Sequence, residues 1–468
     1  MCRISFQAQI SVTSSTHTNL CKSKPCLYLL DIQSMSIYFL TLFQGGLLML
    51  KIVHPVCCGM DVHKKFVVAT IATTDLKNVT TYVKKRFATF NSDLRGLEAW
   101  LLKNDCTEVC MESTGKYWIP IHNVLEGNCH VVVANPKYVA AIKGQKTDDK
   151  DSAWIADLFK FGIVPASFIP PKPIRMLREL FRYRFKLVGH RASEKNRLQN
   201  ALTVSNIALG SVVTDTFGKS SSAIIEYILS CDTFDPEFCK TLLQKSLKNK
   251  ADEVIQSIIG YELSSDQSTK MKVCRKHFDY ITECVDVLDE KIASLAMPYQ
   301  DYINLAVTLP GVKEQSASFI IAEIGNDMTV FHSSKHLCSW AGLTPQNNES
   351  AGKKKSVHVS RAGVYLKPLL VQCANAAIKD SKNPYFKIKY DCIKKRRGHK
   401  RAIIAIARMI LTCLYHMFLK KEAFNPSDTN YSDIPEVLYE KHKQQYITNA
   451  IKLLEREGCK IIPPSATA

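Results

Sequence analysis

Residues 51–165 show two patterns of hydrophobic and polar positions, one typical of strands and one typical of helices. Apolar, β-branched runs without a helical period predict buried strands, and the runs between them predict helices. In chain order the predicted elements are strands Val56–Gly59, Phe66–Ile71 and Val79–Phe90, a helix Leu94–Lys103, a strand Val109–Met111, a helix Tyr117–Leu125, a strand His130–Ala134 and a helix that begins near Asp148. Strands that alternate with helices predict an α/β domain, with antiparallel pairing at its start.

Two long helical patterns follow this domain. The first, over residues 174–202, carries eight Lys or Arg residues against two Glu, so we expect one side of it to face nucleic acid. The second, over residues 271–297, has apolar residues at alternating spacings of four and three, which indicates a heptad seam. Its positions are Cys274, Phe278, Ile281, Val285, Leu288, Ile292 and Leu295. We expect an antiparallel coiled-coil stalk with residues 206–265 as its tip, although a plain helical core and an oligomerising coil explain the seam equally well.

A second functional domain is predicted from Leu309 onward. There Pro310 and Gly311 turn into a helix of small and apolar residues. Such a turn can present backbone N–H groups to a phosphate, as in helix-hairpin-helix modules, although this signal is weak alone. An apolar helix over residues 402–418 closes this mainly helical domain, and a charged helical tail follows.

Composition indicates the partner and the redox compartment. The 468 residues are too many for one ordinary core, and 62 Lys and Arg against 43 Asp and Glu give a net charge of +19. Such a balance favours a polyanion, most plausibly nucleic acid, over a merely solvated basic surface. The 17 Cys form neither CxxC pairs nor a regular framework, which is typical of reduced core thiols in the cytoplasm.

Residues 1–48 differ in pattern from the rest. They combine Ser and Thr runs with an apolar patch over residues 37–50 that is short for a membrane span, and they lack a signal-peptide layout. The compact pattern begins at Met49. We therefore expect residues 1–48 to be an upstream extension without a fold of its own, and no membrane association.

Four acidic residues occupy predicted positions at which a carboxylate needs a counter-charge, a hydrogen bond or a metal ion. Asp148 and Asp151 open a helix and share one face of it, Asp61 lies inside a buried strand, and Glu112 ends another strand. A buried carboxylate is costly unless it is paired or binds a metal, and Mg²⁺ prefers carboxylate oxygens. Helix capping explains the first pair, and salt bridges to Lys64 or Lys116 explain the others, but together the four favour one metal cage.

Three segments then carry a resemblance. GMDVHKK, MESTGKYW and NPKYVAAIKGQKTDDKDSAWIADLF resemble the DEDD domain of the bridge-RNA-guided insertion-sequence transposases of the IS110 family, whose amino-terminal half is RuvC-like. The resemblance implies a ribonuclease-H-like fold and makes Asp61, Glu112, Asp148 and Asp151 ligands of Mg²⁺. Asp149 beside the matched position is an ambiguity, and Ser152 stands where the family commonly has Ala.

A serine in the second domain matches the same family. FHSSKHLCSWAGLTPQNNESAGKKKSVHVSRAGVYLKPLL resembles its carboxy-terminal transposase domain, which makes Ser350 the nucleophile. A loop serine before three lysines could attack a phosphodiester, with the cations stabilising charge on phosphate. Without the resemblance Ser350 is an ordinary loop residue, and Ser356 and Ser360 are nearby competitors.

The densest basic segment extends from Ser350 to Arg401, with 15 Lys or Arg and two Asp. We expect it to bind nucleic-acid backbone, although a solvated helix face is the alternative. Aromatic residues interleave with the charge and could stack on bases, but helical spacing favours core packing for at least two: Tyr365, Tyr385, Phe386 and Tyr390. The predicted binding residues are Lys353, Lys354, Lys355, Arg361, Lys394, Lys395, Arg396 and Arg397.

The sequence thus predicts a Mg²⁺-dependent DNA transposase or recombinase with a serine nucleophile. Its expected partners are donor and target DNA, a bridge RNA, and further copies of itself in a dimer or tetramer, in the bacterial or archaeal cytoplasm at the nucleoid. The alternatives are a metal-only Holliday-junction resolvase-like nuclease and an inactive nucleic-acid-binding remnant. The predicted domains are 1–48 (extension), 49–168 (DEDD), 169–300 (stalk and tip), 301–420 (transposase) and 421–468 (tail).

Overall fold

A computed structural model describes residues 50–139, 148–231, 233–345, 348–350, 353–356 and 358–426, with Ile447 and Ile451. Within these ranges the side chains of 137, 148–150, 245–246, 348–350 and 353–356 are not described. The expectations for residues 1–48 and for the tail beyond Pro426 therefore fall outside the described part. By its internal contacts the chain divides after Ser167 into two compact units, which are described separately below.

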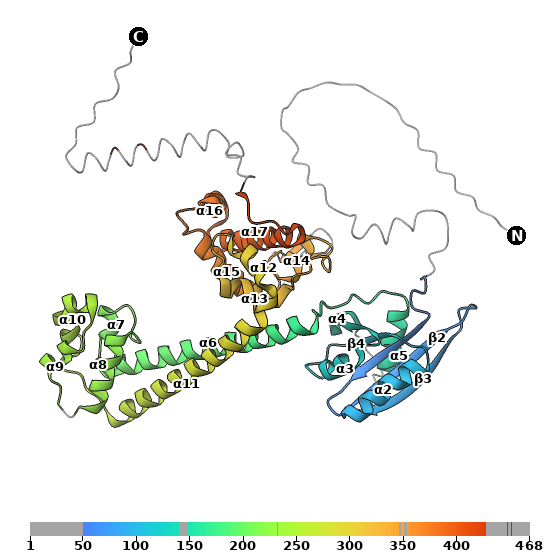
Figure 1. Ribbon diagram of the computed structural model, residues 1–468, viewed down its shortest axis with the longest axis horizontal. Helices are drawn as coiled ribbons and strands as arrows, with labels where there is room; N and C mark the ends of the chain where they lie inside the picture. The colour runs from blue at the N-terminus through green and yellow to red at the C-terminus, as the bar shows by residue number, and fades with distance from the viewer. Residues whose placement is uncertain are drawn as a thin grey trace, which may run out of the picture. The chain divides into compact units, whose positions relative to one another are not determined.

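The first unit is built on a five-stranded mixed sheet in the order β3-β2-β1-β4-β5 (Figure 1). The antiparallel strands β1 to β3 come first in the chain, and β4 and β5 then extend the sheet in parallel with β1. The bounds are β1 Val56–Val62, β2 Phe66–Thr74, β3 Thr80–Ala88, β4 Glu108–Glu112 and β5 His130–Ala134. These are the predicted strands, in the mixed arrangement that a ribonuclease-H-like fold requires.

Helix α5 (Asp148–Lys160) packs on one face of this sheet, directly over β1. Gly59 makes this possible, because a Cβ there would lie 2.3 Å from both the Ser152 carbonyl oxygen and the Ala156 amide nitrogen. Farther back along β1, Cys57 Sγ donates to the Ala156 carbonyl oxygen (3.5 Å). Since lower numbers on β1 meet higher numbers on α5, the helix runs antiparallel to the strand. Its first turn therefore lies toward the end of β1 that carries Asp61.

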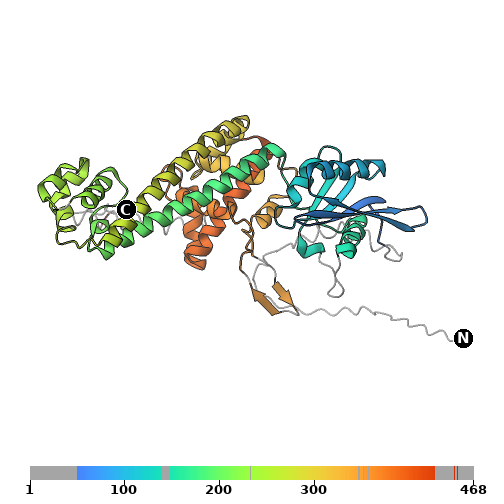
Figure 2. The ribbon, with the colours of Figure 1, turned by 90° about the horizontal axis from the view of Figure 1, so that it is seen from below.

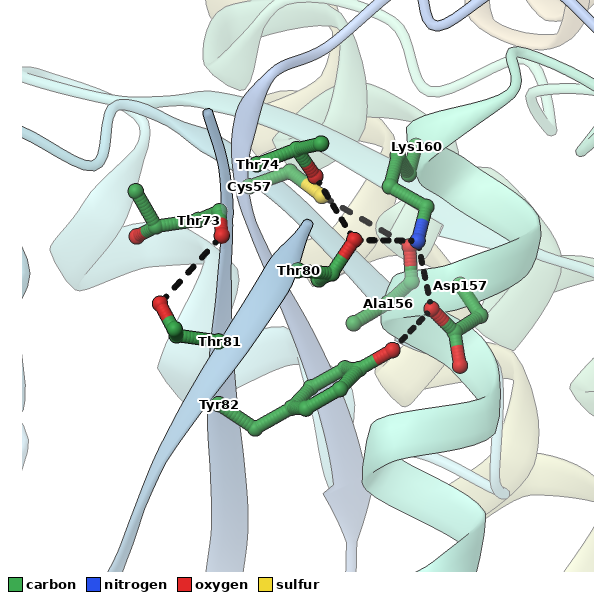
Figure 3. A network of polar contacts seen from close by, with 9 residues as sticks. All are labelled: Cys57, Thr73, Thr74, Thr80, Thr81, Tyr82, Ala156, Asp157 and Lys160. Atoms are coloured by element: carbon green, nitrogen blue, oxygen red, sulfur yellow. Dashed lines mark hydrogen bonds and ion pairs between the residues drawn. The ribbon is translucent and has the colours of Figure 1, made fainter. Parts of the chain in front are cut away.

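The far end of α5 is tied to the edge of the sheet (Figure 3). Lys160 Nζ, which is buried, donates to Asp157 Oδ1 (2.9 Å) and to Thr80 Oγ1 (3.1 Å). The Tyr82 hydroxyl of β3 also donates to Asp157 Oδ1 (2.7 Å), and Thr80 shares a hydrogen bond with Thr74 of β2 (3.0 Å). Because this network and the Gly59 contact hold α5 at two levels, the position of its first turn is fixed by the sheet.

The opposite face of the sheet is covered by helices α2 (Asn91–Lys103) and α3 (Trp118–Leu125), and the short helix α4 (Pro136–Val139) precedes α5. Leu94, Leu97 and Leu101 recur at helical spacing on α2 and are buried, as the sequence predicts. Phe87 of β3 packs against Trp100 of α2, with ring centroids 5.5 Å apart. Along each strand, alternate side chains therefore face α5 on one side of the sheet and α2 and α3 on the other.

The second unit contains two long helices that lie side by side, α6 (Lys172–Val204) and α11 (Ser265–Ala296) (Figure 1). They run antiparallel, since Arg184 pairs with Asp289 while Glu194 pairs with His277. Of the predicted seam, Cys274, Ile281, Val285 and Ile292 are buried. Small helices form a separate cluster at one end of the pair: α7 (Leu209–Val212), α8 (Lys219–Ser230), α9 (Pro236–Thr241) and α10 (Ala251–Gln256), with a 3-10 turn, η1 (Lys245–Lys250). The antiparallel pair is as predicted, whereas coiled-coil packing stays a prediction.

Six helices pack around one core at the other end of the pair: α12 (Gln300–Val307), α13 (Glu314–Ile324), α14 (Ser334–Trp340), α15 (Leu366–Ala377), α16 (Tyr385–Arg397) and α17 (His399–Lys420). A short 3-10 turn, η2 (Met297–Tyr299), joins α11 to them. Among the described helices, α17 is long and apolar enough to cross a membrane, but 56% of its most apolar window is buried in this domain. Its apolarity is explained by ten buried core residues.

Gly311 serves packing in this domain. Its φ of 81° is unfavourable for other residues, and a Cβ there would lie 2.4 Å from the Cys373 carbonyl oxygen of α15. The turn before α13 is thus held against a neighbouring helix. Close packing explains the glycine, and the predicted phosphate contact of a helix-hairpin-helix module stays a prediction.

The segment around Ser350 differs from the predicted loop. It forms a two-stranded antiparallel ribbon, β6 (Asn348–Ser350) and β7 (Lys353–Ser356), in which Ser350 pairs with Lys353. A bridge between Pro345 and Val359 closes the base of this ribbon. Figure 2 shows the two strands as arrows standing apart from the helices of the same unit. Turn-forming residues dominate this stretch of sequence and conceal its two short strands.

The described cysteines are all free, and most are buried. Burial raises the pKa of the Cys57, Cys106 and Cys110 thiols to about 12. Such thiols stay protonated at neutral pH and are poor nucleophiles. This agrees with the predicted role of the cysteines as reduced core residues.

Candidate functional site

Strand pairing brings two of the predicted acids to one end of the sheet. β1 and β4 are parallel, and Met60 pairs with Met111, so Asp61 and Glu112 are the next residues on adjacent strands. Side chains alternate along a strand, so Asp61 shares the face of Gly59, and Glu112 that of Cys110, the partner of Gly59. Both acids therefore lie on the face that α5 covers.

The Asp61 side chain is almost buried, with 9% of the residue exposed. Its Oδ2 accepts a hydrogen bond from Nε2 of His63 (3.0 Å). The sequence prediction does not include His63, although its spacing of two residues along a strand places it on the same face as Asp61. Glu112 is half-buried, and its Oε1 accepts from the Thr114 hydroxyl (3.3 Å). Each acid thus has a local hydrogen-bond partner that orients it.

The third part of the site is the first turn of α5. Asp148 begins the helix and Asp151 is half-buried in its first turn, while the side chain of Asp148 lies outside the described part. Next to Asp151, the Ser152 hydroxyl makes a 2.7 Å hydrogen bond with Thr70 Oγ1 of β2. Both hydroxyl-bearing residues are buried, at 0% and 1% exposed. Ser152, the departure from the usual Ala, therefore anchors the turn that carries the acids.

The donor set fits a hard divalent cation, because every predicted ligand is a carboxylate. In the part of the chain that the structure describes, no three His, Cys, Asp or Glu side chains lie close enough together to hold a metal ion. Asp61, Glu112 and Asp151 belong to that part and do not form such a group, whereas the side chain of Asp148 is not described. The four-carboxylate cage therefore stays a prediction, supported by the topology.

Ser350 ends β6 beside Lys353, and neither side chain is described. The competitor Ser360 has a local structural role: its Oγ accepts the Ala362 amide (3.2 Å) and its carbonyl oxygen accepts from Lys367 Nζ (2.7 Å). Ser356 lies in β7, and its side chain falls outside the described part. The choice of Ser350 as nucleophile therefore stays a prediction.

Several basic residues of α6 are paired with acids inside the second unit. Arg182 donates to both carboxylate oxygens of Glu323 (2.7 and 2.8 Å), and Arg178 donates to the Ala322 and Glu323 carbonyl oxygens. Burial works against the Arg182 charge, but Glu323 outweighs it and raises the Arg182 pKa. Three further pairs use the same helix: Arg184 with Asp289, Lys195 with Asp215, and Arg197 with Glu194. Arg178 and Arg182 thus serve packing within the unit, and the nucleic-acid-facing side of α6 stays a prediction.

In the turn from α16 to α17, by contrast, the basic residues are exposed to solvent. Every residue from Lys394 to Arg401 is exposed, and Gly398 separates the two helices. Among the described residues none of the six Lys and Arg side chains here has a carboxylate partner: Lys394, Lys395, Arg396, Arg397, Lys400 and Arg401. Arg361 is exposed too, while the side chains of Lys353, Lys354 and Lys355 are not described. Phe386 and Tyr390 are buried in the core, which confirms packing for two of the aromatics.

Two family models match the chain. Residues 58–207 match the DEDD transposase model of IS110, and residues 304–391 match the model described as transposase IS116/IS110/IS902 family. The first match contains the whole carboxylate end of the sheet. The second contains the ribbon, the helix α15 and most of α16. The chain thus contains two segments similar to transposase domains, the first of them to a DEDD transposase domain.

Curated relatives agree with this class. A transposase for insertion sequence element IS1111A from Coxiella burnetii (strain RSA 493 / Nine Mile phase I) is 27% identical over 145 residues, which is 30% of this chain and 39% of that protein. A pilin gene-inverting protein from Moraxella lacunata is 28% identical over 31% of this chain and 46% of that protein. One from Moraxella bovis is 28% identical over 26% and 38%.

The aligned regions span less than half the length of each of these relatives. The comparisons support an IS110-type transposase and, more generally, an enzyme of DNA transposition and recombination.

Proposed function

We propose that this protein is a DNA transposase or recombinase that cuts and rejoins phosphodiesters with a carboxylate-held Mg²⁺ and the Ser350 hydroxyl. The observation that carries the proposal is the arrangement of Asp61 and Glu112 on adjacent strands, at the end of the sheet face where α5 begins. The two family matches, one over residues 58–207 and one over residues 304–391, support the pairing of an acid site with a transposase domain.

Each residue has a distinct task in this proposal. Asp61, Glu112, Asp148 and Asp151 would hold Mg²⁺, which supplies charge neutralisation at the scissile phosphate and activation of the attacking oxygen. His63 holds the Asp61 carboxylate, and Ser152 with Thr70 holds the first turn of α5 against the sheet. These supports keep the carboxylates together against their mutual repulsion.

Ser350 performs the covalent step. Its Oγ forms a bond to phosphorus as the phosphorus–O3′ bond breaks, so the DNA is left as a 5′-phosphoserine adduct and a free 3′ hydroxyl, which takes the serine proton. Attack by a 3′ hydroxyl reverses the step and joins a new strand. Because Asp61 and Ser350 belong to different units of the chain, we propose that both act on DNA in the assembled complex, which we expect to be a dimer or tetramer.

The family resemblance also suggests an RNA partner. We propose a noncoding bridge RNA that pairs with donor and target DNA, while the protein contacts the backbone mainly through charge. The exposed Lys394–Arg401 turn suits this role because backbone contacts need cations without counter-charges nearby. RNA co-purified with the protein from its native host, when sequenced, is expected to map beside its gene.

The function is tested with Asp61→Asn, Ser350→Ala and the control Ser360→Ala. Both site variants should lose strand exchange while they keep their fold and DNA binding, and the control should recombine if its fold is retained. Only proteins with Ser350 should yield a denaturant-resistant DNA adduct, mapped by mass spectrometry to that residue. If Ser350→Ala still cleaves DNA and Asp61→Asn does not, the protein is a metal-only nuclease of the resolvase type.

A further inference from the structure

The edge strand β3 carries a cation in line with the candidate catalytic carboxylate. Asp61 of β1 pairs with Val68 of β2, and Val68 pairs with Arg86 of β3, so the three residues form one row across three strands. Paired residues point to the same face, which here is the face of α5. Since neighbouring strands lie about 4.8 Å apart, the Cα atoms of Asp61 and Arg86 are separated by about 10 Å.

A continuous chain of contacts connects these two charges. The guanidinium of Arg86 lies over the ring of Phe66, 3.6 Å from its centroid. The Phe66 ring lies 4.5 Å from the His63 ring, and His63 Nε2 lies 3.0 Å from Asp61 Oδ2. Stacking on an aromatic ring restricts the arginine before any ligand arrives, which lowers the entropy cost of binding.

Arg86 also lacks a counter-charge. It is exposed, and no Asp or Glu among the described residues forms an ion pair with it. The turn between β1 and β2, at the same end of the sheet, adds exposed Lys64 and Lys65. The three cations therefore place positive charge beside the carboxylate end of the sheet, where it can attract the backbone of a polyanion.

We propose that Arg86, with Lys64 and Lys65, binds the phosphodiester backbone of the DNA strand that enters the carboxylate end of the sheet. A Cα separation of about 10 Å places Arg86 near enough to contact the same strand close to the reacting phosphate. This inference rests on the proposed function and adds a substrate-binding surface to it.

Edge strands often carry Lys and Arg for another reason, namely to prevent pairing with other chains. Lys85 provides the control that separates the two explanations. It pairs with Ala69, points to the opposite face and lies over the Phe87 ring, 5.0 Å from its centroid. Charges that only protect the edge can lie on either face of the sheet. A charge that contacts DNA must lie on the face that carries Asp61.

The test compares Arg86→Gln with Lys85→Gln in the full chain, each of which removes one positive charge from the same exposed strand. Binding of a fluorescent DNA duplex is measured against salt with EDTA present, in the wild-type background and in one with Lys394–Arg397 changed to alanine. Arg86→Gln should reduce the log–log salt slope by about 0.9 and weaken binding several-fold. Lys85→Gln should change neither, and Arg86→Lys should restore most of the slope.

Equal effects of the two glutamine variants would overturn the inference, because only net charge would then matter. Loss of binding to an RNA duplex alone, with DNA binding unchanged, would also overturn it and assign the surface to RNA. Full cleavage by Asp61→Asn would reject the proposed function while this comparison stays valid, since binding is measured without cleavage. Circular dichroism of each variant establishes that the fold is retained.

Discussion

Helix α6 and the turn between α16 and α17 are both basic in sequence but use their charges in different ways. On α6, Arg182 lies against the buried Glu323, and Arg184 against Asp289. At the turn, the residues from Lys394 to Arg401 are exposed, and none of their side chains has a carboxylate partner within the described part of the chain. The density of Lys and Arg thus indicates a polyanion surface only where the fold supplies no acids of its own.

The largest expected effect comes from removing an acid that pairs with α6. Glu323 is 2% exposed and receives two hydrogen bonds from Arg182. Glu323→Ala removes two charge-assisted hydrogen bonds, while water can still reach the 38%-exposed Arg182 side chain, so the free energy of unfolding is expected to fall by about 2–3 kcal/mol. Urea denaturation of the full chain measures this. Glu290→Ala, at an exposed position of α11, is the control and should be near neutral. A loss no larger than that of the control would remove the structural role assigned to the pair.

The second effect concerns the exposed turn. Changing Lys394, Lys395, Arg396 and Arg397 to alanine should flatten the log–log salt dependence of DNA binding by about 0.9 for each phosphate that the protein no longer neutralises. Stability should change little, because these side chains are exposed. A matched variant removes three exposed lysines of α11 near the small helices, Lys270, Lys272 and Lys276. If it flattens the slope equally per charge, net charge rather than this turn determines binding.

The same contrast explains what could be predicted from the sequence. The strands of the first unit follow from local apolar runs, and β5 has the predicted bounds, His130–Ala134. The position of Asp61 and Glu112 at one end of the sheet also follows, because parallel strands end together. His63 is missed because a strand pattern shows which face a residue takes but not which polar groups meet there.

Interactions across long sequence distances are the part that could not be predicted. Arg182 and Glu323 are separated by 141 positions, so the helix that looks like a nucleic-acid surface gives no local sign of its partner. Gly59 likewise reads as an ordinary strand residue, although α5 crosses it so closely that a Cβ there would lie 2.3 Å from backbone atoms of the helix. The sequence predicts a loop around Ser350 in place of the ribbon, because strands of three and four residues are too short to show a period.

A third prediction tests a partly exposed pair of α6. Arg184 donates from two nitrogens to the carboxylate of Asp289, which joins α6 to α11. Arg184→Ala should lower the free energy of unfolding by about 1 kcal/mol, less than Glu323→Ala, because water screens this pair more strongly. The DNA salt slope should stay at the wild-type value. A flatter slope would show that α6 also contacts DNA through a residue that is paired within the fold.

The smallest expected effect keeps the charge and changes only its shape. Arg184→Lys retains one positive charge but loses the planar pair of donors that matches the Asp289 carboxylate, so stability should fall by less than about 1 kcal/mol. Arg397→Lys, at the exposed turn, should change neither stability nor the salt slope, since counterion release depends on charge rather than on donor geometry. Thermal unfolding and salt titration of both variants measure the contrast. If Arg397→Lys weakens DNA binding at constant slope, the turn makes a shaped, bidentate contact with phosphate, and its role is more specific than charge alone.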